Sequence, residues 1–85
     1  MALYVTTDHV STETGQYVID TLMQLDGAGS AKLEPQVGGL CRVVMMERAV
    51  RLLAKLPEDS DGHVDTDGRM WIGGTEYPLE VLRND

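Results

Sequence analysis

The long apolar stretch from Leu40 to Leu56 constrains this fold more than any other part of the sequence. Pro57 follows it, and the residue before a proline is pushed out of the helical region, so a helix here has a defined end. We therefore predict a helix over residues 40–56, with apolar side chains covering well over half of its circumference. An ordinary surface helix needs an apolar stripe of only about 100°. This helix is thus either the centre of the fold or, through residues 40–56, the interface of a homodimer.

The N-terminal part of the sequence predicts one strand followed by one helix. Residues 2–7, ALYVTT, alternate in the manner of a short strand. A helix is expected over residues 12–26, where the apolar side chains share one broad face. Asp8 or Ser11 can accept hydrogen bonds from the first backbone N–H groups of that helix. Gly27, which opens the glycine-rich segment GAGS, is a suitable residue to end it.

The last third of the chain carries turn signals that predict a β-hairpin or a three-stranded meander. Asp67-Gly68 is typical of a two-residue hairpin turn. Gly73-Gly74 is a second turn signal. Pro78 should place the final strand at an edge or split it, because proline cannot donate to the strand ladder. The three strands expected on this basis cover residues 63–66, 69–72 and 75–82.

These elements predict one α+β domain over residues 1–85. Its parts are an N-terminal strand, two α-helices and a C-terminal antiparallel β-hairpin or three-stranded meander packed on the second helix. Residues 31–37 fit a loop, a brief strand or the entry to the second helix. The expected core consists of Leu3, Val5, Val18, Ile19, Leu22, Leu25, Val43, Met46, Val50, Leu53, Trp71, Ile72, Leu79 and Val81.

Three features of the sequence favour a cytoplasmic location. The lone Cys41 leaves no partner for an intrachain disulfide, so secretion gains no support. The N-terminal residues MALYVTTDHV contain neither a basic region nor a long apolar run typical of a signal peptide. A membrane-spanning helix needs about 18 or more consecutive apolar residues, and no such stretch exists, so no membrane association is expected.

The sequence offers no convincing metal, cofactor or catalytic motif. Residues 63–74 resemble part of a calcium loop, but His63 and Gly74 occupy the first and twelfth positions, where such a loop requires an acidic ligand. A hairpin explains the same residues. His9, His63 and Cys41 do not pair at the spacings of zinc ligands. So short a chain has little room for the cleft that paired catalytic carboxylates need. We expect no metal, no cofactor and no enzymatic activity.

Charge is distributed unevenly along the chain, which carries a net charge of −7. Residues 42–55 contain four basic residues and one acid, whereas residues 56–85 contain eight acids and two basic residues. This balance argues against binding to nucleic acid, and it either favours a protein partner with a basic surface or serves only to keep the chain soluble. The aromatic residues Trp71 and Tyr77 would contribute to such an interface if exposed, and would otherwise join the core. The acidic candidates are Glu58, Asp59, Asp61, Asp65 and Asp67.

The function expected from these observations is that of a non-catalytic, acidic protein-binding module. Small acidic chains of this type suit regulators or inhibitors such as those carried by phages and mobile elements, which block a basic surface of their partner. One alternative is a winged-helix-like DNA-binding regulator that uses a basic strip on the second helix, formed by Arg48, Arg51 and Lys55. A second alternative is a structural subunit of a larger assembly, docked through residues 40–56.

Overall fold

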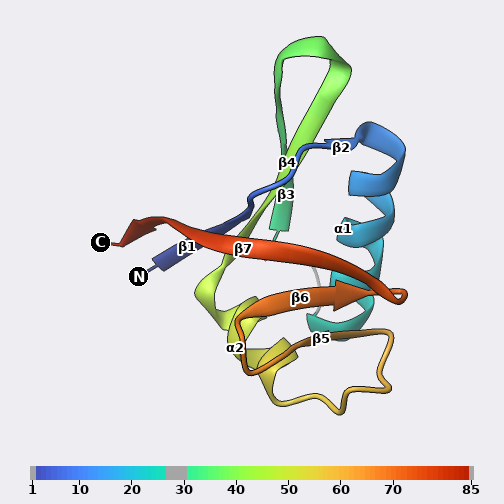
Figure 1. Ribbon diagram of the computed structural model, residues 1–85, viewed down its shortest axis with the longest axis vertical. Coiled ribbons are helices and arrows are strands. Elements are labelled where there is room, and N and C mark those ends of the chain that lie inside the picture. Colours follow the sequence, from blue (N-terminus) through green and yellow to red (C-terminus); the bar gives the residue numbers. More distant parts are fainter. Residues whose placement is uncertain (1, 27–30, 85) are drawn as a thin grey trace.

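The computed structural model describes the backbone of residues 2–26 and 31–84, which form an α+β fold with two helices and an antiparallel sheet of seven strands (Figure 1). The predicted α+β class is confirmed. Within the described residues, neither helix is long and apolar enough to cross a membrane. The elements are β1 (Ala2–Thr6), β2 (Val10–Ser11), α1 (Thr12–Asp26), β3 (Ala31–Pro35), the 3-10 turn η1 (Val37–Gly39), β4 (Leu40–Met46), α2 (Glu47–Ala54), β5 (Gly62–Val64), β6 (Arg69–Ile72) and β7 (Thr75–Asn84).

Strand β7 pairs with two different strands along its length. Residues 75–78 pair with β6, and residues 79–84 pair with β1, which in turn pairs with β4 on its other side. Pro78 lies where the partner changes, and its carbonyl oxygen accepts a hydrogen bond from the Thr7 N–H at 2.9 Å. Proline lacks an N–H and can supply only its carbonyl to the hydrogen bonds between strands. Because Pro78 uses that carbonyl, β7 continues through it.

The predicted helix over residues 40–56 is wrong for its first seven residues. Gly38 and Gly39 have positive φ angles of +83° and +76°, a conformation that glycine adopts without strain. They turn the chain so that β4 runs back along β3 in register from Ala31↔Met45 to Pro35↔Cys41. Only residues 47–54 are helical. The ambiguous segment 31–37 is thus mostly an edge strand.

In β4, most of the apolar side chains are buried within the protein. Cys41, Val43, Val44 and Met45 are all buried, with the two sides of the strand facing opposite surfaces of the sheet. β-Branched side chains such as Val43 and Val44 pack well on a pleated surface. The apolar surplus that predicted a homodimer through residues 40–56 therefore has a different explanation, and the argument for that interface no longer holds.

Helix α1 begins and ends where the sequence predicts, over Thr12–Asp26. The Ser11 Oγ accepts a hydrogen bond from the Thr14 N–H at 3.1 Å, so Ser11 is its N-cap. The helix lies directly on β3 and β4, because a Cβ at Gly15 would come within 2.7 Å of Leu33 Cδ2 and 2.8 Å of Cys41 Sγ. The expected end of the helix at Gly27 lies outside the described residues.

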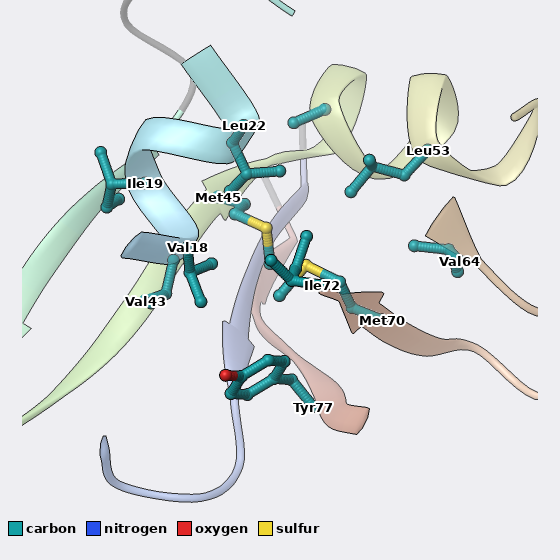
Figure 2. Packing of buried hydrophobic residues seen from close by; sticks show 11 residues of the cluster. Val18, Ile19, Leu22, Val43, Met45, Leu53, Val64, Met70, Ile72 and Tyr77 are labelled. Carbon is teal, nitrogen blue, oxygen red and sulfur yellow. The ribbon is translucent and has the colours of Figure 1, made fainter. Parts of the chain in front are cut away.

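One hydrophobic cluster joins both helices to the sheet (Figure 2). Leu53 of α2 shares it with Met70 and Ile72 of β6. Tyr77, only 6% exposed, belongs to the same cluster, whereas Trp71 does not and Val81 is 53% exposed. The prediction of a core position is therefore wrong for Val81, which is exposed, and for Trp71, which is half-buried outside the cluster. The cluster contains Val18, Ile19, Leu22, Val43, Met45, Ala49, Leu53, Val64, Met70, Ile72 and Tyr77.

Truncation of Leu53 should destabilise the protein strongly because its side chain is only 1% exposed and lies between α2 and the C-terminal strands. We expect Leu53→Ala to lower the free energy of unfolding by about 2–5 kcal/mol, the usual range for a buried leucine that leaves a cavity. Urea denaturation measures this change. The control Val37→Ala, at a residue that is 95% exposed, should change stability by less than about 0.5 kcal/mol. Equal effects would contradict the packing described here.

Candidate functional site

A shallow depression of about 350 Å³ lies between the loop that follows α2 and the turn that joins β6 to β7. Carboxylates line one part of it and an aromatic pair another. The depression therefore combines negative charge with a flat apolar surface. Its lining residues are Glu58, Asp59, Ser60, Asp61, His63, Trp71, Gly73 and Gly74.

The register of the β5–β6 hairpin places the aromatic pair at this depression. Asp65 N–H donates to the Arg69 carbonyl at 3.0 Å, which closes a three-residue loop with Gly68 at φ +79°. The predicted two-residue turn at Asp67-Gly68 is therefore one residue too short. With the longer loop, His63 lies opposite Trp71. Their rings are stacked, with centroids 6.3 Å apart and planes 5° from parallel.

Asp65 fixes both the loop and the orientation of Trp71. Its Oδ1 accepts hydrogen bonds from the Asp67 N–H at 2.9 Å and the Arg69 N–H at 3.0 Å, and its Oδ2 accepts one from Trp71 Nε1 at 2.8 Å. The indole hydrogen bond, followed by the backbone N–H of Arg69, holds the pKa of the Asp65 carboxyl below its ordinary value. Asp65 is thus a positioning residue that orients the indole.

His63 is a lining residue that is absent from the set predicted from the sequence. Its Nδ1 is buried and has no hydrogen-bond partner among the residues that the structure describes. Asp61, His63 and Asp65 alternate along the chain, and residues two apart on a strand point to the same face. That alternation was the available signal that His63 belongs with the two acids.

The predicted acidic residues occupy three different environments. Glu58, Asp59 and Asp61 line the depression, Asp65 lies half-buried beside Trp71, and Asp67 is exposed in the hairpin loop. Among the predicted aromatic residues, Trp71 lines the depression and is half-buried. The condition that Tyr77 be exposed is not met, because its ring is packed in the core.

The predicted basic strip lies on α2 and just after it. Arg48, Arg51 and Lys55 are all exposed, and Arg51 forms an ion pair with Glu47 at 3.0 Å. The two helices are separated by the β3–β4 hairpin rather than by a short turn. The helix-turn-helix arrangement that suggested a winged-helix regulator is therefore absent from the described residues.

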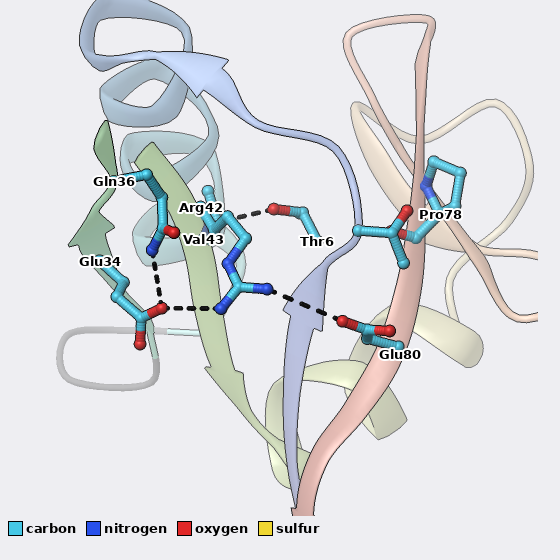
Figure 3. Close-up of polar contacts among 8 residues, drawn as sticks. Thr6, Glu34, Gln36, Arg42, Val43, Pro78 and Glu80 are labelled. Carbon is cyan, nitrogen blue, oxygen red and sulfur yellow. Dashed lines mark hydrogen bonds and ion pairs between the residues drawn. The ribbon is translucent and has the colours of Figure 1, made fainter. Parts of the chain in front are cut away.

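A second polar cluster, centred on Arg42, has a structural role (Figure 3). The Arg42 guanidinium contacts Glu34 of β3 at 2.9 Å and Glu80 of β7 at 3.8 Å. The hydrogen bond from Arg42 lowers the pKa of Glu34. Nearby, the Val43 N–H donates to the Thr6 hydroxyl at 3.1 Å. Arg42 thus ties three neighbouring parts of the sheet together, and its acidic partners are occupied within the chain.

No protein family, curated protein or solved structure compared with this chain matches it. Within residues 2–26 and 31–84, no group of three or more histidine, cysteine, aspartate or glutamate side chains is arranged to hold a metal ion. The depression, with its acidic residues and its aromatic pair, is the candidate binding site of this chain.

Asp65→Asn should flatten the pH dependence of stability at acid pH. The pKa of Asp65 is lowered from its ordinary value of 3.8, so its contribution to stability is full above that value and is lost as the pH falls toward the folded-state pKa. We expect the wild-type melting temperature to fall more steeply below pH 3.8 than that of the variant. Asp67→Asn, in the same loop, is the control. Parallel melting curves for all three proteins would show that Asp65 is not held as described.

Proposed function

We propose that the protein is a non-catalytic binding module whose acidic depression engages, and thereby blocks, a basic surface of a partner protein. One observation carries this proposal. Three carboxylates from the loop after α2, those of Glu58, Asp59 and Asp61, line the same depression as the indole of Trp71. An aromatic surface with charge of one sign beside it is suited to protein recognition, because aromatic residues dominate interface energies while charges select the partner.

The carboxylates of the depression differ in their contacts from those acidic groups that are paired with an arginine inside the chain. Glu76 is paired with Arg69 at 2.7 Å, and Glu34 and Glu80 with Arg42. Within the described residues, no ion pair involves the three carboxylates of the depression. Their charge is therefore available to an external cation.

The net charge of the whole chain supports the same kind of partner. At −7, it attracts a basic protein over a distance comparable to the Debye length, about 10 Å at an ionic strength of 0.1 M. Attraction of this kind raises the association rate and weakens as salt is added. When this module covers the basic surface of its partner, other ligands cannot reach that surface. The module would thus inhibit the partner by steric blocking.

Neutralising the depression should weaken binding to a basic probe. The test compares the triple variant Glu58→Gln, Asp59→Asn, Asp61→Asn with the wild type, using a fluorescently labelled peptide of alternating arginine and glycine and measuring anisotropy at several salt concentrations. We expect the affinity to fall at least about fivefold, since several exposed charge pairs are lost, and the salt dependence to become shallower.

The matched control carries the same change in net charge at acidic residues that do not line the depression. Asp8→Asn, Glu13→Gln, Asp20→Asn replaces three exposed acids, two of them on α1. Its affinity for the peptide should remain close to that of the wild type. If the two triple variants lose affinity equally, the peptide responds only to overall charge and the proposal fails.

A further inference from the structure

We infer that the chemical group recognised in the depression is the guanidinium of an arginine side chain, carried by an exposed segment of the partner. This inference rests on the proposed function, since it takes the partner to be basic, and it adds the identity of the contacting group. It makes arginine, rather than lysine, the determinant of binding.

The first support is the aromatic pair. His63 and Trp71 lie opposite each other on neighbouring strands, with ring planes only 5° from parallel, and both line the depression. A guanidinium is planar and weakly hydrated, so it stacks on aromatic rings, whereas the ammonium of lysine is a compact and strongly hydrated charge. Parallel rings therefore favour arginine.

The second support is the rigid placement of the indole. Trp71 Nε1 donates to Asp65 Oδ2 at 2.8 Å, and Asp65 is itself held by two backbone N–H groups of the hairpin loop. An aromatic ring that is already fixed loses little conformational freedom when a ligand stacks on it. The hydrogen bond also leaves the negative charge of Asp65 beside the indole, where it adds to the attraction for a cation.

The third support is the arrangement of the acids. Glu58, Asp59 and Asp61 come from one short loop beside the rings. A carboxylate can accept two parallel N–H donors from one guanidinium, a geometry that an ammonium cannot match. Stacking on a ring leaves the edge of the guanidinium free for this contact, so the two interactions are compatible.

The far side of the depression leaves room for the main chain of the partner. Gly74 has φ +84°, and a Cβ built there would meet nothing within 4 Å. Gly74 therefore presents bare backbone with open space beside it, whereas the neighbouring Gly73 lies against the Tyr17 hydroxyl, which a Cβ built there would meet at 2.5 Å. In addition, the buried Nδ1 of His63 has no hydrogen-bond partner among the described residues, which is an unfavourable state for a buried polar atom.

The test compares two peptides of equal length and charge, one of alternating arginine and glycine and the other of alternating lysine and glycine. Trp71 is the only tryptophan in the sequence, so its fluorescence reports on the depression itself. We expect the arginine peptide to bind the wild type about three- to tenfold more tightly, the range of a partly desolvated cation–π contact, and to change the Trp71 emission at saturation.

Variants at the aromatic pair separate stacking from general attraction. With labelled peptides and anisotropy as the readout, Trp71→Leu should bind both peptides with nearly equal affinity, and Trp71→Phe should keep part of the preference for arginine. His63→Leu removes one ring of the pair but retains the hydrogen bond between Trp71 and Asp65. It should therefore also reduce the preference for arginine, and it provides the test if Trp71→Leu does not fold.

Equal affinity of the wild type for both peptides, or a preference for arginine that survives in the Trp71→Leu and His63→Leu variants, overturns the inference. In either case the proposed function stands if neutralising Glu58, Asp59 and Asp61 still weakens binding. If neither peptide binds the wild type, the proposed function falls together with the inference.

Discussion

The double pairing of β7 is the constraint on which the rest of the structure depends. Its first residues extend the C-terminal meander, and its later residues pair with β1, which links them through β4 to the β3–β4 hairpin and to α1. The two parts of the sheet are therefore one hydrogen-bonded unit, and their inner faces contribute to one cluster of side chains. Pro78 lies at the junction and uses its carbonyl, the one ladder group that it has.

Local patterns predicted the elements whose structure is decided locally. Helix α1 follows from its capping serine and its single apolar face, and the C-terminal strands follow from their glycine turns. Residues 40–46 could not be assigned in this way, because a segment that is apolar at nearly every position satisfies the period of a buried strand as well as that of a helix. Their strand pairs with β1, about forty residues earlier in the chain, and with β3. Such pairing is decided by tertiary contacts and leaves no local signal.

The candidate site shows how much can depend on one residue of register. A two-residue turn at Asp67-Gly68 would place Thr66 opposite Arg69 and Val64 opposite Trp71, which would turn the indole toward the core, as predicted. The three-residue loop instead sets Val64 opposite Met70 and His63 opposite Trp71. The acids that line the depression were found from the sequence because charge is visible there. The role of Asp65 was not predicted. A sequence does not distinguish an aspartate that accepts three hydrogen bonds from one whose carboxylate is exposed.

The pairing of β1 with β7 joins positions far apart in the chain, from Ala2↔Asn84 to Thr6↔Leu79. A domain that depends on such distant contacts folds slowly, in about milliseconds to seconds for small β-rich domains. The reason is that the entropy of closing a long loop is lost before these contacts stabilise the fold. During synthesis β1 emerges long before its partner, and at 5–20 residues per second it waits roughly 4 to 15 seconds for β7. Until then the edge of β1 that β7 will cover stays unpaired. The time of greatest risk for misassembly therefore falls during synthesis, before the last strand has formed.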